Sequence, residues 1–224
     1  MKNKKFFMIW KNTIYKIMKH LKTFENKETV GKIKYYDNGN IKNIEYLLND
    51  KLHRKDGPAY QECYENGQKK EEGYFINNKH HREDGPAIIE WYENGQKIRE
   101  AYYIDGKYHR KDGPAIQEWY ENGQKKEECY IIDDNYHRED GPAIQEWYKN
   151  GQKSKEEYYI NEKYHREDGP ANIEWDDDGT KKQELYYLND NNYNRVDWIK
   201  KLKVINSPHY EEQKILYDME KYNL

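Results

Sequence analysis

Residues 113–140 read GPAIQEWYENGQKKEECYIIDDNYHRED, and this stretch decides the fold. Two runs of β-prone residues flank Asn122-Gly123, and a second turn follows at Asp133-Asp134. Asn-Gly between such runs is a strong hairpin signal, because a type I′ turn requires positive φ at both central residues. The Asp-Gly-Pro corner then bends the chain and removes one backbone donor. The stretch therefore predicts two antiparallel strands with short turns and no helix.

The same stretch recurs along the chain every 28 residues. A His-Arg pair begins at His53, His81, His109, His137 and His165. Gly-Pro-Ala begins at Gly57, Gly85, Gly113, Gly141 and Gly169. Turn glycines follow the same interval at Gly39, Gly67, Gly95, Gly123, Gly151 and Gly179. Three motifs that recur at the same interval of 28 residues identify a repeat array of about six units.

Aligning the units produces columns of equivalent residues. One column holds Tyr46, Tyr74, Tyr102, Tyr130, Tyr158 and Tyr186, and another holds Trp91, Trp119, Trp147 and Trp175. With a two-residue Asn-Gly loop, Trp119, Ala115, Tyr130 and Ile132 share one face of the sheet. We expect that face to be packed, and the face with Tyr120, Ile116 and Ile131 to be the more polar one.

Composition agrees with aromatic rather than aliphatic packing. The 224 residues are 36% charged and 35% hydrophobic, with 24 Tyr and only three Val. This disfavours a doubly wound α/β enzyme, whose buried strands are rich in Val, Ile and Leu. A formal net charge of −3 gives no general signal for nucleic-acid binding, and no nucleic-acid partner is expected.

The two ends of the array depart from the repeat. Phe6, Trp10, Ile14, Ile17, Met18 and Leu21 fall at helical spacing before the first unit. After Arg195, Trp198 stands where Gly-Pro-Ala should begin, and two short helices are expected to cover the last hairpin. The predicted fold is all-β, an elongated antiparallel sheet of stacked hairpins with helical caps. Its parts are an N-terminal helix (1–30), the array (31–195) and a C-terminal cap (196–224).

The phrase Trp-Tyr-Glu-Asn-Gly-Gln-Lys, followed by a tyrosine strand and an Asp-Gly or Asn-Asn turn, resembles the MORN-repeat-variant family. The resemblance covers roughly Gly31 to Arg195. It implies stacked hairpins used as a scaffold or binding surface. Similar repeats occur in bacterial antitoxin-like proteins and in giant DNA viruses. The 28-residue unit is longer than the usual MORN unit, and its His-Arg-x-Asp-Gly-Pro-Ala corner replaces the usual glycine-rich link.

The repeated His-Arg-x-Asp corner is the strongest candidate for a site. A histidine beside a carboxylate could serve as a metal ligand or general base, and a weaker alternative is a repeated ion site. Five equivalent copies favour architecture, because the Asp can bind the corner backbone, and the Arg can pair with this Asp or with a Glu of a neighbouring repeat. The arginines and aspartates remain candidates for partner contact: Arg82, Asp84, Arg110, Asp112, Arg138, Asp140, Arg166 and Asp168.

Other candidates for chemistry have simpler explanations. A column of glutamates could supply the two carboxylates of a glycosidase, but a solvent-exposed row of glutamates beside lysines is the simpler explanation. The column consists of the glutamates at 62, 90, 118, 146 and 174. The aromatic columns could stack bases or sugars, but they are more often the core of a thin sheet. Cys63 and Cys129 show no metal-ligand spacing and are not expected to be nucleophiles. No catalytic residue, metal or cofactor is predicted.

The first 22 residues are the one strongly basic segment. They hold seven lysines and no acidic residue, a charge of +7, so the rest of the chain carries −10. A basic amphipathic helix can lie on an anionic membrane or bind a partner, with Lys4, Lys5, Phe6, Trp10 and Lys11 as candidate contacts. The alternative is a cap on the first hairpin. Lys11 interrupts the apolar run and no small-residue cleavage site follows, so secretion is not expected.

These observations predict a non-enzymatic scaffold, located in the cytoplasm, that binds another protein. One rival is an inhibitor of the antitoxin or immunity type, which would form a tight complex with a toxin. A second rival is a membrane- or virion-associated structural protein anchored by residues 1–22. The sequence does not identify the partner.

Overall fold

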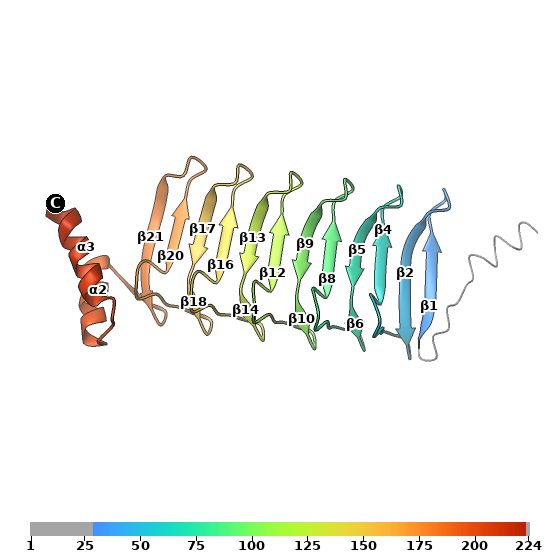
Figure 1. Cartoon of the computed structure of the whole chain (residues 1–224), viewed down its shortest axis with the longest axis horizontal. Coiled ribbons are helices and arrows are strands. Elements are labelled where there is room, and N and C mark those ends of the chain that lie inside the picture. Colours follow the sequence, from blue (N-terminus) through green and yellow to red (C-terminus); the bar gives the residue numbers. More distant parts are fainter. Residues whose placement is uncertain (1–28, 223–224) are drawn as a thin grey trace, which may run out of the picture. The chain divides into compact units, whose positions relative to one another are not determined.

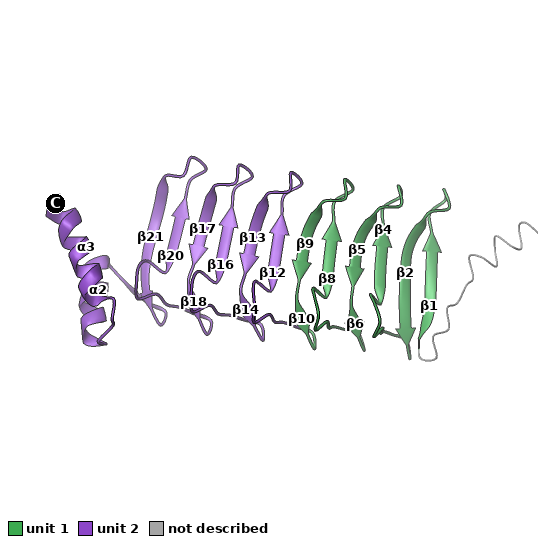
Figure 2. Ribbon diagram, viewed as in Figure 1, with its two compact units in different colours: residues 1–106 green, residues 107–224 purple. Residues whose placement is uncertain are grey.

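The computed structural model describes residues 29–222, which contain 22 strands and two helices (Figure 1). These residues form two compact units that divide after Gly106 (Figure 2). Both units consist of antiparallel hairpins, which confirms the predicted fold class. The predicted N-terminal helix, with its candidate contacts Lys4, Lys5, Phe6, Trp10 and Lys11, lies outside the described residues.

Unit 1 comprises β1 (Val30–Tyr35), β2 (Ile41–Leu48), β3 (Lys51–Leu52), β4 (Tyr60–Cys63), β5 (Lys69–Gly73), β6 (Phe75–Ile76), β7 (Lys79–His80), β8 (Ile88–Trp91), β9 (Lys97–Ala101) and β10 (Tyr103–Ile104). Its long strands follow one another in the order β1-β2-β4-β5-β8-β9, each antiparallel to the next. The short strands form a second, smaller hairpin below each long one, such as β6 with β7.

Unit 2 repeats this plan and ends in helices. Its elements are β11 (Lys107–Tyr108), β12 (Ile116–Trp119), β13 (Lys125–Cys129), β14 (Ile131–Ile132), β15 (Asn135–Tyr136), β16 (Ile144–Trp147), β17 (Lys153–Glu157), β18 (Tyr159–Ile160), β19 (Lys163–Tyr164), β20 (Asn172–Trp175), β21 (Lys181–Leu188), β22 (Asn191–Tyr193), α2 (Arg195–Val204) and α3 (Tyr210–Tyr222). The long strands follow the order β12-β13-β16-β17-β20-β21-β22.

The long hairpins do not close through the predicted type I′ turn. Between β12 and β13, Gly123 has a φ of 81°, whereas Asn122 is not among the described residues with positive φ. Tyr120 N–H donates to the Gln124 carbonyl at 2.8 Å, and the register of β12 shifts by one residue beside the turn. This is a type I turn followed by a left-handed glycine, the usual three-residue hairpin loop.

The short hairpins do use type I′ turns, as predicted. Positive φ values occur at both central residues, for example 53° at Asp105 and 84° at Gly106 in unit 1. In unit 2 the values are 51° at Asn161 and 65° at Glu162. A non-glycine pair is held in this region because the second turn residue bonds to the preceding repeat: Glu162 N–H donates to the Tyr136 carbonyl at 2.9 Å.

Side chains of the Tyr-Glu-Asn-Gly turn join each hairpin to the next. Tyr120 Oη donates to the Trp147 carbonyl at 2.8 Å, and Asn122 Nδ2 donates to the Lys149 carbonyl at 3.2 Å. The same tyrosine contact recurs from Tyr36 to Cys63, Tyr64 to Trp91 and Tyr148 to Trp175. The turn residues therefore determine repeat stacking as well as the turn itself.

The packed face is the one that the sequence interpretation took to be polar. In unit 2 the buried cluster contains Ala115, Cys129, Ile131 and Ile144, with Ile116, Tyr108, Tyr136 and Tyr159 packed against it. Trp119, Tyr130 and Ile132 are only half-buried. The expectation of a packed face with Trp119, Ala115, Tyr130 and Ile132 was wrong for all of these residues except Ala115, which is part of the buried cluster. The Gly-Pro-Ala alanines are fully buried, with exposed fractions of 0% at Ala59, Ala87, Ala115, Ala143 and Ala171.

The helices expected after the array are present and pack on the last hairpin. Asn194 caps α2 by accepting a hydrogen bond from Asp197 N–H at 2.9 Å. Trp198 has an exposed fraction of 0% and lies against Tyr186, with 4.9 Å between ring centroids. The indole N–H of Trp198 donates to the Arg166 carbonyl at 3.2 Å. None of the described helices is long and apolar enough to cross a membrane.

Candidate binding site at the corner loops

Each His-Arg-x-Asp-Gly-Pro corner holds its arginine in three ways. Arg138 Nε donates to Asp140 Oδ1 at 2.8 Å, and its Nη1 donates to the Pro142 carbonyl at 3.4 Å. The guanidinium carbon lies 3.9 Å from the centroid of the Tyr130 ring. Stacking on an aromatic face and donation in a fork are the two contacts that guanidinium makes and an ammonium group does not. The predicted partner arginine is therefore part of the corner structure.

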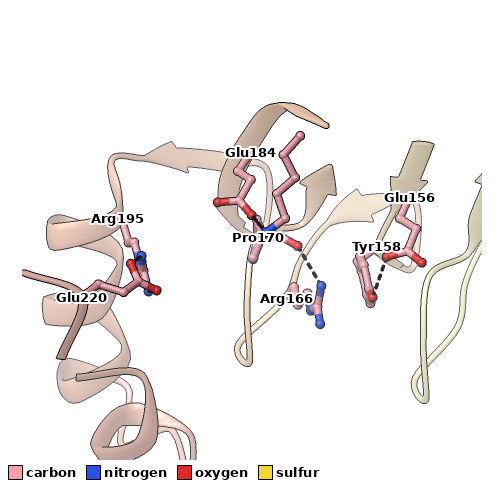
Figure 3. A network of polar contacts seen from close by, with 8 residues as sticks. Glu156, Tyr158, Arg166, Pro170, Glu184, Arg195 and Glu220 are labelled. Carbon is pink, nitrogen blue, oxygen red and sulfur yellow. Dashed lines mark hydrogen bonds and ion pairs between the residues drawn. The ribbon is translucent and has the colours of Figure 1, made fainter. Parts of the chain in front are cut away.

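The same arrangement recurs in both units. In unit 1, Arg54 stacks on Tyr46 at 4.1 Å and Arg82 on Tyr74 at 4.0 Å. In unit 2, Arg166 stacks on Tyr158 at 3.8 Å and donates to the Pro170 carbonyl (Figure 3). The corner glycine covers the other side: a Cβ at Gly141 would lie 3.1 Å from the Arg138 guanidinium carbon. A side chain at this position would require the guanidinium to shift by a few tenths of an ångström.

The repeated histidines support the type I′ turn of the next short hairpin. His137 Nδ1 accepts from Asn161 N–H at 3.2 Å, and His165 Nδ1 accepts from Asn189 N–H at 3.3 Å. His81 Nδ1 lies 3.1 Å from Asp105 N and accepts its N–H in the same way. A histidine whose Nδ1 is occupied by a backbone donor has an architectural role, in agreement with the interpretation favoured from the sequence.

Between consecutive corners lies a groove, which we call the corner groove. In unit 2 one corner groove of about 750 Å³ is lined by Arg138, Arg166 and Tyr158, among other residues. Another, of about 440 Å³, lies between Arg110 and Arg138, over Tyr130. Unit 1 has one of about 570 Å³ between Arg54 and Arg82. The same residue types thus line several grooves in turn.

The exposed part of each corner is its carboxylate. The side chains of Asp84, Asp112 and Asp140 have exposed fractions of 84%, 86% and 85%, whereas their partner arginines are 22–23% exposed. The hydrogen bond from the arginine, together with its charge, lowers the pKa of each of these aspartates below the usual value. A partner at this surface therefore meets ionised carboxylates above an aromatic floor.

The groove nearest the C-terminal helices differs from the others. His209, from the segment between α2 and α3, also lines it. Gln213 Nε2 donates to the Asp168 carbonyl at 3.0 Å, and the Asp168 side chain is 52% exposed. Of the eight residues predicted for partner contact, the structure leaves Asp84, Asp112 and Asp140 most open to solvent. It covers much of each arginine side chain, which leaves the predicted arginine contacts untested.

Two features of the corner face were missed from the sequence. Four rings of the tyrosine column are each covered by the arginine eight positions later: Tyr46, Tyr74, Tyr130 and Tyr158. A Gln–Glu–Lys row crosses the same face: Gln117 Nε2 and Lys125 Nζ both donate to Glu128 Oε1, at 2.9 and 2.6 Å. The constant Tyr-to-Arg spacing was the signal that could have found the first feature.

The described residues contain neither a metal-binding group of side chains nor a cysteine with a lowered thiol pKa. No group of three or more His, Cys, Asp and Glu there could hold a metal ion. Cys129 has an exposed fraction of 1%, and burial raises the pKa of its thiol, so it stays protonated. Cys63 is likewise a free cysteine with a raised pKa, caused mainly by burial.

The comparisons with known proteins agree with this geometry. The model of the MORN repeat variant matches residues 88–105 and 116–133, which are the long hairpins β8–β9 and β12–β13 with the first residues after each. No curated protein matches the chain. MORN repeats commonly serve in protein interaction or as scaffolds, and the family is generally non-enzymatic. Two repeats of this chain, one in each unit, therefore match the MORN repeat variant, and both units repeat the same hairpin plan.

Proposed function

We propose that this chain is a non-enzymatic scaffold whose protein partner binds across the corner grooves. The observation that carries the proposal is recurrence: the same stacked Tyr–Arg pair and exposed carboxylate line grooves in both units. Aromatic floors supply contact area, while ionised rim carboxylates supply orientation and partner selectivity. A partner with basic or amide side chains at the spacing of the corners fits this surface.

The test is affinity purification of the full chain from its native source, with mass spectrometry of the proteins retained. The variant Asp112→Asn with Asp140→Asn removes two exposed corner charges and keeps acceptor oxygens for Arg110 and Arg138. Its matched control, Glu121→Gln with Asp177→Asn, removes two charges from the exposed turns of the long hairpins. Both variants should unfold at the temperature of the unaltered chain.

A partner lost with the corner variant and retained with the control supports the proposal. Retention by both variants contradicts it. The stoichiometry then separates the finer classes. One tightly bound protein whose activity is blocked places the chain among inhibitors of the antitoxin or immunity type, whereas several partners place it among scaffolds.

A further inference from the structure

Helix α3 has two apolar sides, and unit 2 covers one of them. Tyr210 and Tyr217 pack against the cluster around Trp198, and Gln213 between them is buried. The opposite side carries Ile215, Leu216, Met219 and Tyr222, with exposed fractions of 55%, 42%, 44% and 61%. At 3.6 residues per turn, positions 215, 219 and 222 form one stripe that points away from positions 210, 213 and 217. We call these four exposed residues the outer stripe.

The outer stripe is an uncommon feature for this chain. Among the described residues, few large apolar side chains outside the C-terminal helices are exposed, and these include Val30 and Ile41. Contiguous exposed apolar side chains on a helix usually mark a surface that another element covers. In the part of the chain that the structure describes, no element covers this stripe.

The charges beside the outer stripe indicate what kind of element fits it. Glu211 and Glu212 are exposed at the start of α3, and Asp218, which pairs with Lys214 at 3.0 Å, lies on the same side as Glu211. Two copies of α3 packed in parallel would bring the acidic first turns together, which disfavours that arrangement. An anionic membrane would be repelled in the same way. An apolar stripe with an acidic rim fits a basic amphipathic helix.

The chain contains one such segment. Residues 1–22 carry +7 with no acidic residue, and Phe6, Trp10 and Ile14 occur at helical spacing. We propose that residues 1–22, from the same or a second copy of the chain, bind the outer stripe of α3, with their lysines facing Glu211, Glu212 and Asp218. The segment then serves neither as a cap on the first hairpin nor as a membrane anchor.

A zero-length crosslinking experiment on the full chain tests this directly. A carbodiimide joins a lysine amine to a carboxylate only when the two are in contact, and mass spectrometry locates each bond. Lys4 and Lys11 should crosslink mainly to Glu211, Glu212 and Asp218. Mixing isotopically light and heavy chains shows whether each bond lies within one copy or between two.

Paired variants separate the apolar contribution from charge. Ile215→Asn with Met219→Asn leaves the net charge unchanged, and loss of two apolar contacts should lower these crosslinks about tenfold or more. The matched control, Ile41→Asn with Val196→Asn, alters apolar residues that are 36% and 38% exposed elsewhere, and should leave them unchanged. The proposal is overturned if lysines of residues 1–22 crosslink mainly to other carboxylates, or if both variants give the same crosslinks as the unaltered chain.

Discussion

The two units are built from the same hairpin, yet they end differently. Unit 1 begins at β1, where Val30 is 46% exposed, and in the described residues β1 pairs on one side only. Unit 2 ends beneath α2, where Trp198 and Leu202 have exposed fractions of 0%. A single hairpin cannot bury its own apolar residues, so each repeat depends on what lies beside it. At the end of unit 2 the chain replaces a further repeat by two helices.

Of the changes proposed here, Trp198→Ala should have the largest effect, because it removes the packing of the helices on the last hairpin of unit 2. Removing a fully buried indole costs about 3–5 kcal/mol, because the transfer free energy is lost and a cavity remains. Hydrogen exchange should show lost amide protection in β20–β22, α2 and α3, while unit 1 keeps its protection. The control Val204→Ala, at a side chain 71% exposed, should leave protection in place. Unchanged protection in the Trp198 variant would show that the helices do not stabilise the last hairpin.

His80→Tyr should remove a pH dependence of stability that is expected for unit 1. His80 occupies the column filled by Tyr136 and Tyr164 in unit 2, and its ring lies 4.0 Å from the Phe75 ring. Burial, helped by the charge of Arg99, lowers the pKa of His80 from 6.5 to about 4.

Between these two pH values the unfolded chain binds a proton that the folded chain does not, so stability falls as the pH falls from 6.5 toward 4. The loss is about 1–3 kcal/mol, allowing for the solvent that reaches the ring. Urea unfolding at pH 7 and pH 5 should show a smaller loss for the tyrosine variant. Equal losses for variant and unaltered chain would remove His80 as the cause.

Glu71 in unit 1 and Lys155 in unit 2 occupy equivalent positions in their repeats and carry opposite charges. Glu71 lies directly opposite Glu62 and Glu90, whereas Lys155 lies opposite Glu146 and Glu174 in the same register. Burial, followed by the charges of Glu90 and Glu62, raises the pKa of Glu71.

Like charges opposite one another destabilise a sheet by roughly 0.2–1 kcal/mol per pair. Glu71→Lys should therefore stabilise unit 1 by about 1 kcal/mol at pH 7, and Lys155→Glu should destabilise unit 2 by a similar amount. Ionised Glu71 opposes folding above its raised pKa, so the gain should shrink in acid as the carboxyl is protonated. Urea unfolding measures both variants, and changes of the same sign would contradict the explanation.

The smallest expected effect concerns the second residue of the type I′ turn. Gly106 fills this place in unit 1 with a φ of 84°, and Glu162 fills it in unit 2 with a φ of 65°. A side chain in this region costs about 1 kcal/mol, so Glu162→Gly should raise the thermal midpoint of unit 2 slightly. Gly106→Glu should lower that of unit 1. A lower midpoint for the Glu162 variant would mean that the glutamate side chain contributes contacts worth more than the backbone strain.

Prediction from the sequence succeeded where the signal was local or periodic. The Asp-Gly, Asn-Asn and Asp-Asp pairs indicated type I′ turns, and Trp198 indicated where the repeat ends. It failed at Asn122-Gly123, because choosing between a two-residue and a three-residue loop depends on how the flanking strands pair. The difference stays local to the turn, because Ile116 still pairs with Cys129 and Gln117 with Glu128, as a two-residue loop predicts. The packed face was assigned wrongly because residues of the short hairpins, such as Ile131 and Tyr136, pack on the opposite face.

The corner site was predicted in part. Arg138 and Asp140 were selected because they recur, and their mutual hydrogen bond was anticipated. The position of the guanidinium between Tyr130 and Gly141 was not anticipated. It depends on how the strand that carries Tyr130 and the corner loop that carries Gly141 meet in space. The exposed carboxylates follow from this, since the covered arginine leaves its partner on the outside.

The sequence by itself determined the repeat, its 28-residue period, the turn chemistry and the presence of helices after the last hairpin, because each is encoded in neighbouring residues or in their spacing. Tertiary structure alone decided which sheet face is buried, which half of each corner ion pair meets solvent, and which side of α3 remains open. These outcomes depend on side chains from different repeats meeting across the sheet. A large aromatic column is compatible with either face until residues of the short hairpins, such as Ile131 and Tyr136, pack on one of them.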